Sequence, residues 1–134
     1  MPGAVQLRPA GVGANRVSFT VGAVYSGRMT DTVKAQFAVG QLVHHRLFDY
    51  RGVVIDVDPY FKGTDEWYDH MARSQPPKDR PWYHVLVDGA DMRTYVAERN
   101  LEADTQGTAI THPALADHFD HFANGGYVVR DKLN

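Results

Sequence analysis

The chain contains no cysteine among its 134 residues, which excludes disulfides, thiolate-ligated zinc and thiol catalysis. No apolar run approaches the roughly 18 residues that a membrane-spanning helix needs. The N-terminus also lacks the charged segment followed by an apolar one that marks a secretory signal peptide. These absences make a cytoplasmic protein, without a membrane partner, the expectation.

The chain also lacks an excess of positive charge. Fourteen Lys and Arg stand against sixteen Asp and Glu, and residues 35–103 hold eight basic and eleven acidic side chains. Non-specific nucleic-acid binders usually carry a basic excess, because neutralising phosphates supplies most of their affinity. Any DNA binding would therefore use a local patch. No nucleophile elbow, phosphate loop or metal-ligand cluster is recognisable either, so we expect a binding protein that is not an enzyme and needs no cofactor or metal.

Residues 1–33 differ from the rest in composition. Up to Arg28 the segment holds three arginines and no acidic residue, and its apolar residues follow neither a helical nor a strand period. Since it offers no organised apolar face, we expect a disordered extension, or translation begun upstream of a natural start at Met29. A targeting segment is the alternative, because transit peptides are also rich in arginine and poor in acids.

Residues 34–104 have the pattern of one small β domain. Runs rich in β-branched and aromatic residues alternate with clusters of Gly, Pro and Asp. These runs are 41–47, 52–58, 82–88 and 93–97. Short antiparallel strands in this number normally curl into a small barrel, because closure removes exposed edges. The sequence therefore predicts a mainly β fold, an antiparallel barrel spanning about residues 37–103.

Alternation along the runs predicts which side chains face the core. The predicted inward residues are Val43, Val53, Ile55, Val57, Val85 and Val87. Trp82 and Tyr83 are adjacent, so they point to opposite faces of the sheet. With Tyr83 inside, Trp82 and His84 lie on the outer face, where Trp82 either anchors a partner or is buried beneath the insert of residues 60–81.

That insert is expected to hold a helix over residues 64–73. Thr64 can cap it, two acidic residues in its first turn match the helix dipole, and Gln75-Pro76-Pro77 ends it. The side chains of Trp67 and Met71, four residues apart, would form one apolar side.

A second helix is expected in a C-terminal extension, residues 105–134. Pro113 is well placed at its first position, and Asn124-Gly125-Gly126 would end it. Leu115, Phe119 and Phe122 would form its apolar stripe.

The β-rich part resembles a known family. In order along the chain stand the runs GQLVHHRLFDYRGVVIDVDP, PWYHVLVD and TYVAERNL. They are similar to the HspQ/YccV-like family, also described as hemimethylated-DNA-binding domains, over residues 35–103. The resemblance implies an SH3-like barrel without enzymatic activity. It also implies a heat-shock or stress-response protein that binds hemimethylated DNA and influences proteolysis by the Lon protease.

The resemblance can be followed residue by residue. The positions that match the family pattern are Gly40, Val43, His45, Gly52, Asp56, Asp58, Pro59, Trp82, Tyr83, His84, Tyr95, Glu98 and Leu101. The chain departs from the short form of the family in residues 1–33 and in its C-terminal extension, which leaves the identity of the partner open.

Two function classes remain. The first is a protein-interaction module that modulates Lon or its substrates. The slight excess of acidic over basic residues in the chain favours this class. The alternative is a module that binds hemimethylated DNA through a local basic patch. Such a patch would be drawn from His44, His45, Arg46, Arg51, Lys78, Arg80 and Arg99. Across both classes the predicted partner-binding residues are His45, Arg46, Arg51, Trp82, His84, Tyr95 and Glu98. A second copy of the chain is a further open partner.

The histidines form a weak case for a metal site. His44, His45 and His84 would need to meet across strands, and no fixed carboxylate partner is evident in the sequence. His118 and His121 are spaced to share one side of the expected C-terminal helix, where a solvated helix face is the simpler explanation.

Asp56 and Asp58 share a strand face and end at Pro59. Paired carboxylates can do acid–base work, but no nucleophile accompanies them. The simpler explanation is that Asp58 and Pro59 end the strand while Asp56 accepts a local hydrogen bond.

Overall fold

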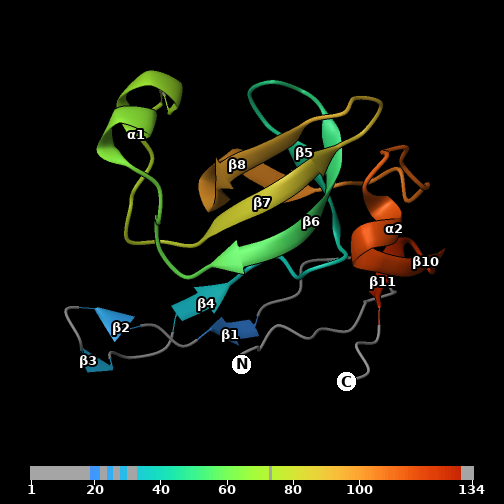
Figure 1. Cartoon of the computed structure of the whole chain (residues 1–134), viewed down its shortest axis with the longest axis horizontal. Coiled ribbons are helices and arrows are strands. Elements are labelled where there is room, and N and C mark those ends of the chain that lie inside the picture. Colours follow the sequence, from blue (N-terminus) through green and yellow to red (C-terminus); the bar gives the residue numbers. More distant parts are fainter. Residues whose placement is uncertain (1–18, 22–23, 26–27, 30–32, 73, 131–134) are drawn as a thin grey trace.

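A five-stranded antiparallel sheet forms the centre of the computed structural model (Figure 1). Hydrogen-bonded neighbours in this sheet follow the order β8-β7-β6-β5-β9. Its strands are β5 (Leu42–His45), β6 (Arg51–Asp58), β7 (Trp82–Val87), β8 (Arg93–Ala97) and β9 (Leu101–Ala103). The structure describes the chain except residues 1–18, 22–23, 26–27, 30–32, 73 and 131–134. The prediction of a mainly β, antiparallel fold is confirmed.

The sheet rolls so that its two edges approach each other. β8 and β9 lie at opposite edges, yet only the 3-10 turn η1 (Glu98–Asn100) separates them in sequence. No ladder joins β8 to β9 among the described strands. The expected barrel is therefore partly open, and a turn rather than a row of hydrogen bonds brings its edges together.

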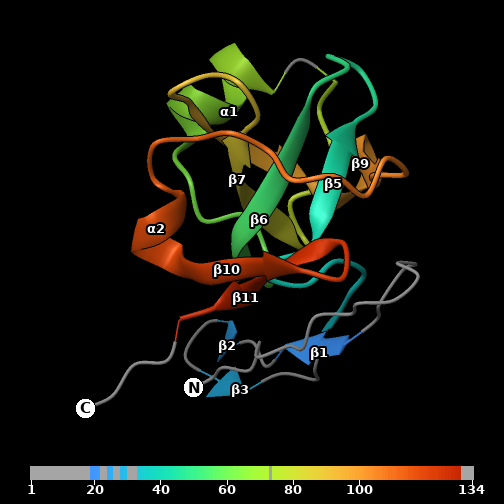
Figure 2. The ribbon, with the colours of Figure 1, turned by 90° about the vertical axis from the view of Figure 1, so that its right-hand side faces the viewer.

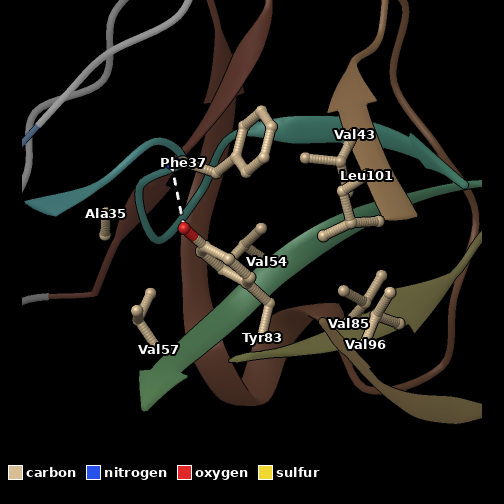
Figure 3. Close-up of a cluster of buried hydrophobic side chains, with 9 residues drawn as sticks. All are labelled: Ala35, Phe37, Val43, Val54, Val57, Tyr83, Val85, Val96 and Leu101. Carbon is tan, nitrogen blue, oxygen red and sulfur yellow. Dashed lines mark hydrogen bonds between the residues drawn. The ribbon is translucent and has the colours of Figure 1, made fainter. Parts of the chain in front are cut away.

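The inside of the rolled sheet holds one apolar cluster (Figure 3). Its members are Ala35, Phe37, Val43, Val54, Val57, Tyr83, Val85, Val96 and Leu101. Val43, Val57 and Val85 are therefore inside as predicted, while Val87 is buried outside this cluster. Tyr83 is also inside, so the assignment of its two neighbours to the outer face is confirmed.

The predicted inward position of Val53 and Ile55 is wrong. The register of β6 against β7 shifts between Val54 and Asp56, which makes Ile55 the extra residue of a β-bulge. Because a one-residue slip reverses the alternation, Val54 and Val57 share the inner face instead. Val53 is buried on the outer face, and Ile55 is partly buried beside it.

This outer face packs against the C-terminal segment through a second apolar cluster. Its buried members are Leu42, Val53, Leu86, Ile110, Phe119 and Tyr127. Two strands, β10 (Phe119–Ala123) and β11 (Gly126–Val129), form a hairpin that lies beside the sheet (Figure 2). The core of the molecule therefore continues well past the five-stranded sheet.

The expected C-terminal helix is reduced to a single turn, α2 (Leu115–His118). The prediction of a longer helix is wrong because Asn124 and Gly125 form the tip of a hairpin rather than a helix stop. Both have positive φ, 52° and 80°, which is what a two-residue type I′ turn between antiparallel strands requires.

Gly40 is the point at which this hairpin docks on the sheet. The N–H of Tyr127 donates to the carbonyl of Gly40 at 2.8 Å, and Gln41 forms a bridge with Gly126. Gly40 has a φ of +93°, and a Cβ there would lie 2.2 Å from the Tyr127 carbonyl oxygen. Only glycine fits this close approach.

The insert folds over the other end of the outer face. Its helix α1 (Asp65–Met71) begins as predicted, since Thr64 Oγ1 accepts a hydrogen bond from the N–H of Trp67 at 3.1 Å. Aromatic rings from the insert and the sheet cover Trp82, which is only 1% exposed. The rings in this aromatic cluster are Phe61, Trp67, Tyr68, Trp82 and Tyr95. Of the two expected alternatives for Trp82, the structure has burial beneath the insert.

The described residues before Gln36 form two short ladders. β1 (Phe19–Val21) pairs with β4 (Val33–Ala35), and β2 (Val24–Tyr25) pairs with β3 (Arg28–Met29). Most of the stretch 1–33, which the sequence predicts to be a disordered extension, lies outside the described residues, so that expectation stays a prediction. Among the described helices, none combines the length and the apolar composition that a membrane span requires.

Candidate functional site

A surface pocket of about 300 Å³ lies where the two edges of the sheet meet. It is lined by Gln36, Arg46, Pro77, Arg80, Ala97, Glu98, Arg99 and Leu101. These residues come from the ends of β4, β5 and β8, from η1 and β9, and from the end of the insert. The same rolling that closes the core therefore builds this pocket from segments far apart in the sequence.

Three guanidinium groups surround the pocket. Arg46 is half exposed, its Nε donates to the carbonyl of Leu101 at 3.2 Å, and its Nη1 lies 3.3 Å from Glu102. Arg99 donates to the carbonyl of Ser74 at 2.7 Å. Arg80 forms no ion pair with any residue that the structure describes. Because arginine stays charged at all ordinary pH values, the pocket is suited to an anion.

Glu98 is the one carboxylate in the pocket lining, and internal hydrogen bonds already engage it. Its Oε2 accepts from the Tyr83 hydroxyl at 2.7 Å and from the N–H of Gln36 at 2.8 Å. Burial, followed by the neighbouring Glu98, holds the pKa of Tyr83 far above its ordinary value, so the hydroxyl stays protonated and donates. The charge of Glu98 is therefore partly satisfied from within.

Arg51 does not join the pocket. Its side chain is only 13% exposed and lies 3.1 Å from Asp104 and 3.5 Å from Asp88. It also donates to the carbonyl of Thr108. Its contacts thus hold the segment after β9 against the sheet.

His45 is buried and shapes the hairpin loop between β5 and β6. Its Nδ1 accepts from the N–H groups of Leu47 and Phe48, at 3.1 and 3.0 Å. Burial, and then the neighbouring His44, lowers the pKa of His45, which favours the neutral ring that these bonds require. His45 is only 4% exposed, so its predicted role as a direct partner contact stays a prediction that its burial does not favour.

The loop that His45 holds presents two apolar side chains to solvent. Leu47 is 57% exposed and Phe48 is 68% exposed, and the Phe48 ring stacks on the His45 ring at 4.7 Å. Leu47 and Phe48 directly follow Arg46 in the sequence. This pair is absent from the residues predicted to bind a partner, although two large apolar residues at a hairpin tip are a recognisable signal of an interaction surface.

His84 and Tyr95 belong to a different group, on the outer face of β6, β7 and β8. Asp58 Oδ2 accepts from the Tyr95 hydroxyl at 2.6 Å and lies 3.2 Å from His84 Nε2. Burial alone would raise the pKa of Asp58, but the hydrogen bonds from His84 and Tyr95 outweigh it and lower that pKa. The carboxylate of Asp56 lies beside this group, and together with Asp58 and His84 it forms the one set of three candidate metal ligands among the described residues.

The structure thus divides the predicted partner-binding residues among several places. Arg46 and Glu98 line the pocket, while His84 and Tyr95 lie in the outer group. Trp82 is buried in the aromatic cluster, and its Nε1 donates to the carbonyl of Pro77 at 3.1 Å, so it supports one wall of the pocket.

The histidines do not combine into the metal sets considered from the sequence. His44 hydrogen-bonds Glu102 through Nδ1 and Asp49 through Nε2, so both of its ring nitrogens already have carboxylate partners. His118 ends α2 and His121 lies in β10, so they do not share a helix.

These features define a small rolled β domain with an arginine-lined pocket where the two edges of its sheet meet. The family model described as "Hemimethylated DNA-binding protein YccV like" matches residues 35–126. That match covers more than half of the chain, and the chain belongs to this family. The matched range extends past β9 through β10 to the first residue of β11.

Proposed function

We propose that this protein binds duplex DNA in the hemimethylated form that describes its family, and that the arginine-lined pocket receives a backbone phosphate. The observation that supports this is the convergence of Arg46, Arg80 and Arg99 on one pocket. The domain acts by binding, not by catalysis.

The charge balance of the pocket supports an anionic ligand. Three guanidinium groups face two nearby carboxylates, Glu98 and Glu102, and Tyr83 and Gln36 already hydrogen-bond Glu98. A planar guanidinium matches a phosphate with two parallel hydrogen bonds, which a lysine does not. A chain with a net charge of −2 can therefore bind DNA at this one place while the rest of its surface contributes little.

The proposal is tested by following the arginine Nε–H resonances of the labelled protein while a hemimethylated duplex is added. We expect the resonances of Arg46, Arg80 and Arg99 to shift and that of Arg51 to stay, because its ion pairs occupy it. Shifts confined to the C-terminal hairpin, or none at all, would contradict the proposal. Unmethylated and fully methylated duplexes of the same sequence show whether the methyl group on one strand matters.

A second candidate function is modulation of proteolysis by the Lon protease through protein contacts, which the family resemblance implies. The exposed pair Leu47 and Phe48 favours it, since a fixed apolar pair on a hairpin tip suits insertion into a partner. His45 holds the loop in place, so the pair is presented at little entropic cost.

This candidate is tested with purified Lon and a protein substrate, with nuclease present. The wild-type chain should change the degradation rate, and the double variant L47A/F48A should lose most of that effect. Met92 is also an exposed apolar residue, so M92A is the matched control and should behave as the wild type. An unchanged rate with the wild-type chain would rule out a direct effect on Lon.

A further inference from the structure

We propose that Asp56, Asp58 and His84 bind one divalent transition-metal ion on the outer face of β6 and β7. Each residue offers one ligand atom, and these atoms all lie within 4.8 Å of one another. The site is separate from the arginine-lined pocket and does not depend on the DNA proposal.

The fold brings these residues together through the bulge in β6. After the bulge, Asp56 stands opposite His84 of β7, and Asp58 follows two residues later on the same face. Tyr95 of β8 stands opposite His84 on its other side. Bulges commonly re-aim a side chain next to a functional site, and here the bulge aligns Asp56 with His84.

The spacing suits coordination. Zinc holds its nitrogen and oxygen ligands at about 2.0–2.2 Å, so neighbouring ligand atoms of one tetrahedral ion lie roughly 3.3–3.6 Å apart. Asp58 Oδ2 and His84 Nε2 are 3.2 Å apart, just below this range, so a small side-chain movement would bring both atoms to coordination distance. Asp56 is exposed, so its carboxylate can rotate to complete the set.

Neighbouring groups hydrogen-bond the proposed ligand Asp58 and fix its orientation. The Tyr95 hydroxyl donates to Asp58 at 2.6 Å, and the N–H of Lys62 donates to the Tyr95 oxygen at 3.0 Å. Such outer contacts fix the orientation of a ligating carboxylate. Among the described residues, no lysine or arginine lies within ion-pair distance of either carboxylate, and the charge of Lys62 acts on Asp58 only from a longer distance.

The donor set selects the kind of ion. One imidazole nitrogen and two carboxylate oxygens suit zinc and its first-row neighbours better than magnesium or calcium, which prefer oxygen alone. Three protein ligands leave further positions for water or for an outside ligand. Bound there, the ion would tie β6 to β7 beside the aromatic cluster.

His44 shows why two carboxylates near a histidine do not suffice. Asp49 lies 2.6 Å from its Nε2 and Glu102 lies 2.7 Å from its Nδ1. The two carboxylates therefore sit at different ring nitrogens, and one ion cannot contact both together with the ring. His44 is thus a matched control for His84.

The test is calorimetric titration of zinc into the full chain after treatment with a chelator. We expect one site per chain, at least about tenfold weaker in D56N and in H84Q, and unchanged in H44Q. D56N alters an exposed side chain that accepts only the N–H of Val57 in the described structure, so the variant should fold normally, which circular dichroism checks.

A thermal melt gives the second readout, because a ligand that binds only the folded state raises the melting temperature. Zinc should raise it in the wild type and in H44Q but not in D56N. The proposal is overturned if no binding occurs at millimolar zinc, if all variants bind equally, or if H44Q rather than D56N loses the site.

Discussion

The hydroxyl of Tyr83 donates a 2.7 Å hydrogen bond to Glu98 and so connects the buried core with the arginine-lined pocket. The same oxygen accepts from the N–H of Gln36 at 3.1 Å and from the N–H of Phe37 at 3.3 Å, and Figure 3 shows the bond from Phe37. One buried side chain thus joins the start of η1 to the segment before β5, at the place where the two edges of the sheet meet. Tyr83 therefore helps to set the shape of the pocket.

Removing that hydroxyl should be costly. Y83F leaves the N–H of Phe37 without its acceptor and removes one of the two donors to Glu98, while the N–H of Gln36 still donates to Glu98. We therefore expect a loss of about 1–3 kcal/mol in the free energy of unfolding. Y50F is the control, because the Tyr50 hydroxyl bonds only Thr94, at 2.7 Å, and it should lose less. Urea unfolding measures both. Equal losses would mean that the hydrogen bonds of Tyr83 do not stabilise the contact between the two edges of the sheet.

The docking of the C-terminal hairpin should depend on Gly40. A Cβ at this position would displace the Tyr127 carbonyl, so G40A should lower the free energy of unfolding by more than the roughly 1 kcal/mol of unfavourable backbone conformation. Gly89 also has positive φ, but nothing lies within 4 Å of its added Cβ, so G89A shows the backbone effect alone. If the two variants are equally stable by urea unfolding, the hairpin does not rest on Gly40.

The alternation of apolar and polar residues predicted four strands of the sheet and the inward position of Val43, Val57, Tyr83 and Val85, but it failed at the bulge in β6. A period of two cannot reveal an extra residue, since Gly52 to Asp58 alternates acceptably in either register until β7 is placed beside it. The tip of the C-terminal hairpin failed for a different reason. Asn-Gly is a hairpin signal as well as a helix stop, and the apolar stripe favoured the wrong one.

The site was only partly predictable for the same physical reason. Arg46, Arg80 and Arg99 were each candidates, but only the rolling of the sheet shows that they share a pocket while Arg51 is held by Asp104. Two residues of the family motif have structural roles. Gly40 allows the C-terminal hairpin to dock, and Tyr83 hydrogen-bonds Glu98 where the two edges of the sheet meet.

The bulge makes a direct prediction about packing. V54A should lower the free energy of unfolding by about 2 kcal/mol or more, because Val54 is fully buried inside the sheet. Ile55 is only partly buried on the outer face, so I55A should cost less although it removes more atoms. Chemical unfolding of both variants checks the order, and a larger loss in I55A would mean that the faces are reversed.

Asp58 should make stability depend on acidity. Its folded-state pKa is lowered, so its contribution is complete above its unfolded pKa of about 3.9 and is lost as the pH falls through the folded value. Y95F removes one of the hydrogen bonds that lower this pKa. The stability difference between wild type and Y95F should therefore be largest near neutral pH and shrink below about pH 4. Urea unfolding from pH 7 to pH 2, with a chelator present, tests it, and a difference that is constant across this range would contradict it.

The most direct test of the account is the affinity for a hemimethylated duplex, measured by fluorescence anisotropy at several salt concentrations. The double variant R80A/R99A should bind at least about tenfold more weakly than the wild type, and its salt slope should be smaller by about one to two. R93A removes an exposed arginine that does not line the pocket, so it should bind nearly as the wild type does. If R80A/R99A binds as tightly as the wild type, or if R93A weakens binding equally, the pocket is not the DNA site.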